Sequence, residues 1–204
     1  MTTSSRFGII LRLLRPSWIV IGCAAAVGTM ISCAVPVGSP PAPPPYNKSE
    51  VRHLAVPFFP DDSDKCGPVV LASILGYWGK SATLRDLQEE VYLPAIHGSL
   101  PLDLLTAAQA RGLDATSYRG SLSNIIAEID MGHPLIALLD SGHWIFSQGH
   151  FVVITGYDAL REGVYVHSGT SADLFIPYER LLAPWNKTGR WTLLVIPANH
   201  GGTT

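Results

Sequence analysis

DKCGP at residues 64–68 and the apolar run VVLASILGYW at residues 69–78 decide the fold of this chain. Apolar residues recur in the run at helical spacing, and a proline is tolerated in the first turn of a helix. The sequence therefore predicts a buried helix with Cys66 at its N-terminus. Unpaired N–H groups and the helix dipole favour a thiolate there, as a cysteine nucleophile requires. A cysteine that only packs in a core is the alternative, but Gly67 and Pro68 favour a loop that enters a helix.

Cysteine usage also singles out Cys66. The chain has three cysteines, and Cys23 and Cys33 fall in an apolar N-terminal segment. Cys66 is then the only cysteine of the predicted domain, so neither an internal disulfide nor a Cys-x-x-Cys metal site is expected. A lone thiol in an exported protein risks oxidation, and its presence suggests a chemical role.

Length and charge limit the classes of function. The 204 residues suffice for one domain and an N-terminal appendage. A folded part of about 150 residues buries roughly 70% of its surface and needs no metal for stability. The formal net charge is −2, and no cluster of Lys and Arg falls in the predicted domain. We therefore expect no nucleic-acid partner, no metal and no cofactor.

The N-terminus has the pattern of a secretory signal. Basic residues precede an apolar segment at residues 18–32, which is short for a membrane span of about 20 residues. Cys33 resembles the lipidated cysteine of bacterial lipoproteins, so residues 1–32 are expected to be a cleaved signal. Cleavage before Cys23 and an uncleaved anchor are the alternatives. Ala34 does not resemble an inner-membrane retention signal, which predicts an outer-membrane protein that faces the periplasm of a two-membrane cell.

The remaining chain divides into a tether, a domain and a tail. Residues 33–50 are the lipidated cysteine and a Pro-rich spacer, residues 51–197 the domain, and residues 198–204 a flexible tail. Within the domain, helices are predicted first and an antiparallel sheet second, which indicates an α+β fold. Helices are expected to start near residues 83, 99 and 121, with a short one at 178–182, and strands are expected at 53–59, 114–118, 135–140, 143–146, 150–158, 163–169, 173–177 and 191–197.

A thiolate nucleophile needs a base within hydrogen-bond reach. Of the seven histidines, His150 stands at the mouth of the most β-branched strand, where it can face a helix N-terminus across a cleft. We therefore predict His150 as the base. We interpret three further histidines as solvent-facing loop residues: His97, His133 and His200. His53, His143 and His167 are the others.

Two motifs, DKCGPVVLASILGYWG at residues 64–79 and GHFVVITGYD at 149–158, resemble a known family. They are similar to the peptidase domain that removes double-glycine leaders from bacteriocins, a branch of the papain-like cysteine peptidases. The resemblance covers roughly Val56 to Pro197, and the lipobox and tether suit a stand-alone lipoprotein branch. It implies a papain-like fold with Cys66 as nucleophile on the helical half and His150 as base on the antiparallel sheet.

The chain departs from the family at the oxyanion hole. The family usually has a Gln shortly before the cysteine, and its amide helps to bind the oxyanion. Pro60 and Asp61 occupy those positions here. An ionised carboxylate cannot donate a hydrogen bond, so Asp61 is a poor substitute, although the backbone N–H of Cys66 can contribute one donor. Loss of one such donor typically costs about 100- to 1000-fold in rate.

The chain also departs from the family at the group that orients the histidine. Where the family has Asp-Pro, Ser168 stands nearest the Asp position with His167 beside it. A hydroxyl can bond the imidazole but provides no negative charge. Ser168 is the leading candidate for this third catalytic position, and His167, Asp158 and Asp173 are alternatives.

The sequence thus predicts an exported, lipid-anchored cysteine peptidase that acts on a peptide or protein. Cys66 would form a thioester after attack on a peptide carbonyl, and the resemblance suggests cleavage after small residues such as Gly-Gly. One alternative is a catalytically weakened domain that binds a peptide or an assembly partner. Another is an acyltransferase or amidase that uses the same Cys-His pair.

Overall fold

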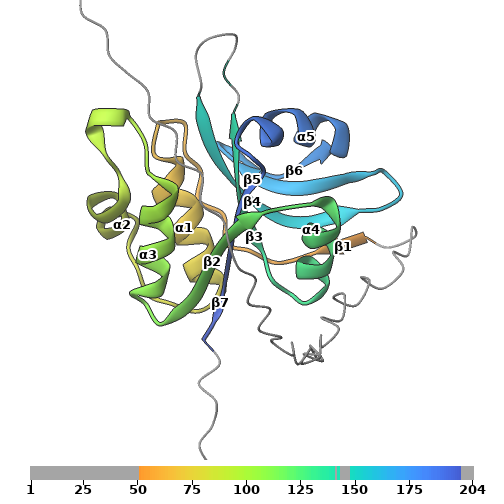
Figure 1. Cartoon of the computed structure of the whole chain (residues 1–204). Coiled ribbons are helices and arrows are strands. Elements are labelled where there is room, and N and C mark those ends of the chain that lie inside the picture. The colour runs from red at the N-terminus through yellow and green to blue at the C-terminus, as the bar shows by residue number, and fades with distance from the viewer. Residues whose placement is uncertain (1–50, 141, 143–147, 199–204) are drawn as a thin grey trace, which may run out of the picture. The chain divides into compact units, whose positions relative to one another are not determined.

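The computed structural model describes residues 51–140, 142 and 148–198, all within the unit of residues 41–204. The predicted signal, lipidated cysteine, tether and most of the C-terminal tail lie outside the described residues, as does the strand predicted at 143–146. The domain is built on a seven-stranded sheet with helices on both faces (Figure 1).

All strand pairs are antiparallel, and the order across the sheet is β2-β7-β3-β4-β5-β6, with β1 paired to the far end of β4. The strands are β1 (Val51–His53), β2 (Leu113–Arg119), β3 (Leu135–Asp140), β4 (Gly149–Asp158), β5 (Gly163–Ser168), β6 (Ser171–Pro177) and β7 (Trp191–Pro197). The helices are α1 (Cys66–Tyr77), α2 (Leu84–Val91), α3 (Pro101–Gln109), α4 (Leu122–Asp130) and α5 (Tyr178–Lys187), with a 3₁₀ turn η1 (Pro94–Ile96).

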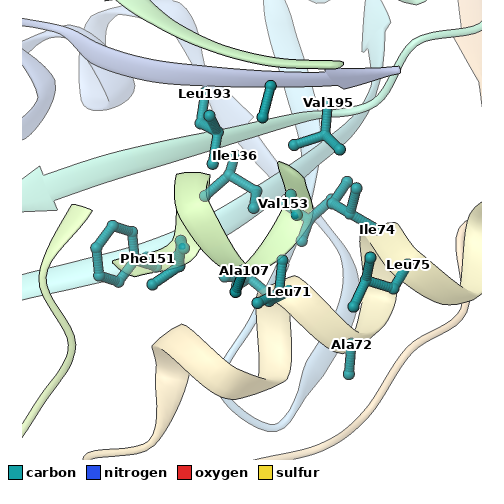
Figure 2. Close-up of a cluster of buried hydrophobic side chains, with 14 of the residues drawn as sticks. Leu71, Ala72, Ile74, Leu75, Ala107, Ile136, Phe151, Val153, Leu193 and Val195 are labelled. Atoms are coloured by element: carbon teal, nitrogen blue, oxygen red, sulfur yellow. The ribbon is translucent and has the colours of Figure 1, made fainter. Parts of the chain in front are cut away.

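Strand β4 divides the hydrophobic core in two. Its side chains alternate between the faces of the sheet, so that Phe151 and Val153 join one cluster and Val152 and Ile154 join the other. The first cluster contains the apolar faces of α1, α2 and α3, and Figure 2 shows α1 and α3 packed toward the sheet. The second contains those of α4 and α5. Both faces of β4 are covered, which explains the continuous apolar run at residues 151–154.

Helix α1 has the bounds that the sequence predicts. Leu71, Ile74 and Leu75 are fully buried, and almost the whole helix is apolar because it is covered on several sides. Two of the predicted helix starts are capped by side chains: the Thr83 hydroxyl accepts from the Asp86 N–H, and the Ser121 hydroxyl accepts from the Asn124 N–H.

Two elements differ from their predicted extent. The strand expected at 53–59 ends at His53. The Leu54 N–H still donates to the Thr155 carbonyl of β4, but the Val56 N–H turns back to the Leu54 carbonyl and Pro57 has no N–H to donate. Helix α5 was expected to stop at Leu182 but continues to Lys187 across Pro184. Fully buried Trp185 anchors this last turn in the second cluster, which offsets the hydrogen bond that Pro184 removes.

Candidate active site

Cys66 is the first residue of α1, as the sequence predicts. Lys65 is the N-cap, and no described side chain caps the helix there. The backbone N–H groups of Cys66 and Gly67 are directed to the thiol. Gly67 is required for packing, because a Cβ at this position would lie 2.3 Å from the Ser99 hydroxyl, which precedes α3. The start of α1 is therefore fixed against the chain that enters α3.

His150 lies near the start of β4, opposite Leu139 of β3. The next residue, Phe151, donates its backbone N–H to the thiol of Cys66, so the first turn of α1 meets the first residues of β4. Cys66 and His150 line one cleft of about 440 Å³. Its other lining residues are Ser63, Asp64, Ile96, His97, Gly98, Ser99, Leu138, Gln148, Gly149 and Phe151.

Ser168 contacts His150, with 2.9 Å between its Oγ and the imidazole Nε2. It is the last residue of β5, where the pairing with β6 shifts by one residue between Val166 and Ser168. Of the four candidates for the orienting group, Ser168 is therefore the one bonded to this ring. The bond at Nε2 leaves Nδ1 as the nitrogen that can act on the thiol.

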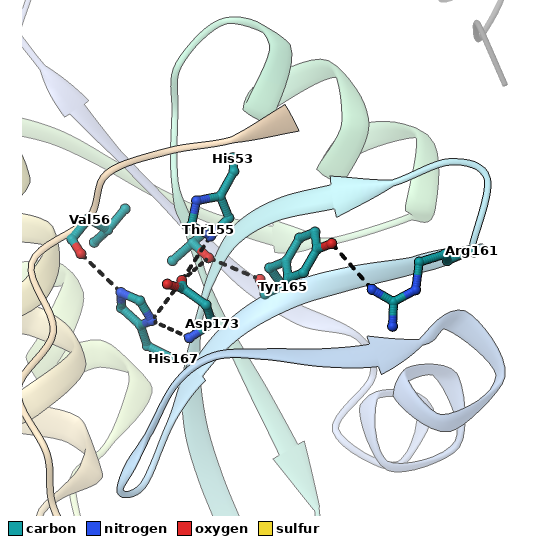
Figure 3. A network of polar contacts seen from close by, with 7 residues as sticks. All are labelled: His53, Val56, Thr155, Arg161, Tyr165, His167 and Asp173. Atoms are coloured by element: carbon teal, nitrogen blue, oxygen red, sulfur yellow. Dashed lines mark hydrogen bonds and ion pairs between the residues drawn. The ribbon is translucent and has the colours of Figure 1, made fainter. Parts of the chain in front are cut away.

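The other three candidates are held elsewhere, and Figure 3 shows His167 and Asp173. The Nε2 of His167 donates to the Val56 carbonyl at 3.0 Å, and its Nδ1 accepts from the Asp173 N–H at 3.2 Å. The Asp173 carboxylate pairs with His53 at 2.8 Å. Asp158 accepts the backbone N–H of Arg161 at 2.9 Å, in the turn between β4 and β5.

The electrostatics of the site differ from the expectation of a thiolate at a helix N-terminus. Burial raises the pKa of the Cys66 thiol, against the backbone N–H groups that lower it, and the charge of Asp61 raises it further. Burial lowers the pKa of His150, against the charge of Asp61. Desolvation thus outweighs the helix N-terminus, and burial favours the neutral thiol and the neutral imidazole.

Asp61, the residue at the oxyanion position, lies close to the reactive pair. Its backbone N–H donates to the Gly169 carbonyl at 3.1 Å, and its Oδ1 accepts from the Ser63 hydroxyl at 2.6 Å. It also lines a small cavity of about 10 Å³ with Cys66 and Ser168. A carboxylate there cannot donate to an oxyanion, so the backbone N–H at the start of α1 is the donor that remains.

The remaining histidines fall into three groups. His97 is exposed as predicted, with 80% of its side chain accessible, whereas His53 pairs with Asp173. The prediction for His133 was wrong, because only 23% of its side chain is accessible. Its Nδ1 bonds Glu128 at 2.8 Å and its ring lies against Trp78. Glu128 stands five residues earlier on α4, but Trp78 comes from the end of α1, so that contact depends on the fold. The last two, His143 and His200, lie outside the described residues.

One polar cluster at the edge of the cleft was not predicted from the sequence. The Asp64 carboxylate accepts from the Tyr92 hydroxyl at 2.7 Å and contacts the His97 ring at 3.0 Å. The Tyr92 bond is the main reason that the pKa of Asp64 is lowered. These residues come from the loop before α1 and from both sides of η1, and no local pattern links them.

Within residues 51–140, 142 and 148–198, no group of His, Cys, Asp and Glu side chains is arranged to hold a metal ion. In the same part of the chain, none of the helices combines the length and the apolar character that a membrane crossing needs.

The fold resembles those of solved peptidase structures. A double-glycine motif protease from an AMS/PCAT transporter, solved with its leader peptide, shares 23% identity over 73% of this chain and 100% of its own, with a TM-score of 0.55. The peptidase domain of Streptococcus ComA shares 21% identity over 73% of this chain and 100% of its own, with a TM-score of 0.56. A putative C39-like peptidase from Bacillus anthracis shares 19% identity over 73% of this chain and 98% of its own, with a TM-score of 0.58.

Comparison with curated proteins gives no match. The model of the Peptidase_C39 like family matches residues 44–190, which include the cleft, both predicted motifs and Ser168. The suspected family, the papain-like α+β fold and the assignment as a peptidase are thereby confirmed. The chain belongs to the Peptidase_C39 like family of peptidases.

Proposed function

We propose that this peptidase cuts peptide bonds through a thioester on Cys66, with His150 as base and acid and Ser168 as the group that orients His150. The observation that carries the proposal is the shared cleft, lined by the thiol of α1 and the imidazole of β4. The bond between Ser168 and Nε2 supports the same assignment, because it holds the ring and leaves Nδ1 as the nitrogen that would exchange a proton with the thiol.

The reaction begins with transfer of the thiol proton to Nδ1 of His150. Sγ of Cys66 attacks the carbonyl carbon, and the carbonyl oxygen becomes an oxyanion that the N–H at the start of α1 binds. The C–N bond breaks as the imidazolium returns its proton to the leaving amine. Water then attacks the thioester and gives a proton to His150, the C–S bond breaks, and the proton returns to sulfur.

The raised thiol pKa and the lowered imidazole pKa mean that the reactive ion pair must form after substrate enters. A peptide in the cleft excludes water and adds an electrophile next to the thiol, so proton transfer and attack are expected to occur together. Together with the missing oxyanion side chain, this predicts a slower enzyme than one with a preformed thiolate.

We propose a peptide substrate cut after small residues such as Gly-Gly. Support comes from the similar AMS/PCAT protease, whose structure contains a leader peptide. A panel of peptides that differ only in the two residues before the cut tests the preference, with kcat/KM as the readout.

We also propose that a lipid on Cys33 anchors the domain to the outer membrane, on the periplasmic face, after removal of residues 1–32. The signal-like N-terminus and the Pro-rich spacer support this. Membrane fractionation of the full chain and of a Cys33→Ser variant tests it, with Cys23→Ser as the matched control. A wild-type protein found wholly in the soluble fraction would contradict the anchor.

The catalytic proposal is tested first without a known substrate. The full chain in detergent is treated with a peptide vinyl sulfone, an electrophile that needs an activated thiol, and labelling at Cys66 is followed by mass spectrometry. We expect labelling that His150→Ala reduces strongly and that the control His53→Ala, on β1 and not among the residues that line the cleft, leaves unchanged. Equal labelling of the His150→Ala variant would contradict the proposed pair.

One observation favours a second function. The thiol has a raised pKa, and neither the oxyanion position nor the orienting position has the expected side chain. A peptide-binding protein with little catalysis has these properties. Binding of a peptide by both the wild type and Cys66→Ala, without turnover by the wild type, would support this reading over the peptidase.

A further inference from the structure

We propose that Asp61 is a positioning residue: from the loop before α1 it supplies the negative charge that stabilises protonated His150, a charge that Ser168 cannot provide. The inference rests on the proposed roles of Cys66 and His150.

A charge is needed because His150 must hold a proton for part of the reaction. It carries the thiol proton until the leaving amine takes it, and imidazolium in a half-buried site is costly without an anion nearby. Ser168 contacts Nε2 at 2.9 Å but its hydroxyl is neutral. The stabilising carboxylate therefore has to come from another element.

The carboxylates near the site in sequence are mostly committed to other partners. Asp173 is paired with His53 and lies against His167 rather than His150, as Figure 3 shows. Asp158 is bonded in the turn between β4 and β5. Asp64 is bonded by Tyr92 and His97. Asp62 is exposed.

Asp61 is instead fastened to the turn that carries Ser168. Its N–H donates at 3.1 Å to the carbonyl of Gly169, the residue directly after Ser168. Gly169 has a φ of +57°, which a glycine adopts easily, and this conformation forms the tight turn between β5 and β6. Asp61 and Ser168 also line one small cavity with Cys66. The loop before α1 is thus bonded to the chain at the end of β5, next to a cavity that Cys66 also lines.

The electrostatic effect of this placement is felt by both reactive groups. The charge of Asp61 raises the pKa of His150, against the effect of burial. It also raises the pKa of Cys66, in the same direction as burial. The Ser63 hydroxyl donates to the Asp61 carboxylate at 2.6 Å, which holds the carboxylate in place. Asp61 therefore favours the protonated imidazole while it opposes a free thiolate.

The test is an NMR titration of the His150 ring in the full chain in detergent, with the signal assigned by its loss in His150→Ala. Asp61→Asn removes the charge but keeps an oxygen for the Ser63 hydroxyl. We expect its His150 midpoint to move to lower pH. The control Asp62→Asn removes one charge from the exposed neighbour and is expected to leave the midpoint where it is in the wild type.

Two further variants separate charge from structure. Asp61→Glu keeps the charge and is expected to hold the midpoint near that of the wild type. The exchange variant, Asp61→Asn with Ser168→Asp, moves the carboxylate to the end of β5 and is expected to raise the midpoint above that of Asp61→Asn alone. Circular dichroism checks that each variant is folded.

Three results would each overturn the proposal. These are an unchanged midpoint in Asp61→Asn, an equal fall in Asp62→Asn, and no recovery in the exchange variant. None of these readouts requires hydrolysis of a substrate. If the enzyme proves inactive on every peptide, the proposed function fails while the titration still decides the role of Asp61.

Discussion

Two histidines of the same sheet, His150 and His167, occupy contrasting environments. His167 is 6% exposed, and both ring nitrogens bond main-chain groups, the Val56 carbonyl and the Asp173 N–H. His150 has a side-chain hydroxyl on one nitrogen and a cleft beside it. A ring bonded twice to the backbone has no nitrogen left to exchange protons with a substrate. The contacts of the two ring nitrogens thus say more about the role of a histidine than its place in the sequence does.

The largest expected effect comes from removing either member of the reactive pair. Cys66→Ser and His150→Ala are each expected to reduce kcat by at least about a thousandfold, because nucleophile and base act as a unit. Steady-state cleavage of a peptide measures this. The variant Cys66→Ser/His150→Ala should be no worse than either single variant, and additive losses would contradict a shared step.

The second expected effect is on stability and concerns His167, the histidine bonded twice to the backbone. His167→Ala leaves the Val56 carbonyl and the Asp173 N–H without their partner, so we expect the free energy of unfolding to fall by about 2–3 kcal/mol. Urea denaturation measures it. His53→Ala, which removes the exposed partner of Asp173, is the matched control and should cost less than about 1 kcal/mol. Equal losses in the two variants would mean that His167 is not the structural member.

The third effect concerns the hydroxyl that holds His150. Ser168→Ala removes one hydrogen bond worth about 1 kcal/mol, which corresponds to about a five- to tenfold fall in kcat/KM. Cleavage kinetics at fixed pH measure it. Ser168→Thr keeps a hydroxyl and should recover most of the rate. If Ser168→Ala matches the wild type, the bond seen at Nε2 plays no part in turnover.

The smallest effect is the pH dependence of stability. The His150 pKa is lowered in the folded state, so the unfolded chain binds more protons, and stability falls as pH drops below the ordinary imidazole value of about 6.5. The Cys66 pKa is raised, so stability falls as pH rises above the ordinary thiol value of about 8.5.

The melting temperature is therefore expected to be highest between these two values. Differential scanning fluorimetry from pH 5 to pH 10 measures it, with His150→Ala expected to flatten the acid side and Cys66→Ser the alkaline side. A wild-type profile that neither variant alters would contradict the burial of the pair.

Much of the architecture follows from local patterns in the sequence. The helix at Cys66, the N-caps at Thr83 and Ser121 and the buried strand of His150 each carry a signal within a few residues. Local signals also place Cys66 at the start of its helix and His150 near the start of its strand. They cannot predict which residues from other elements contact them.

The parts that could not be predicted depend on contacts between distant segments. The helix N-terminus at Cys66 favours a thiolate locally, but packing of β4 against it buries the thiol and reverses the sign of the effect. His133 reads as a loop residue, yet Trp78 and Glu128 enclose it. The hydrogen bond from the Asp61 N–H to the Gly169 carbonyl likewise depends on the fold, because the residues around each position carry no sign of it.

The shared position of β4 between two cores has a consequence for regulation. Residues 151–159 are all buried, and the side chains of residues 151–154 pack alternately into the two clusters. Amide groups of this strand should exchange with solvent only when the whole domain unfolds. Partial opening of the sheet is therefore not expected to switch off the proposed base His150 next to it. The segment before α1 is attached to the end of β5 by the Asp61 N–H bond to the Gly169 carbonyl and by the His167 bond to the Val56 carbonyl, so control through this segment would have to break both.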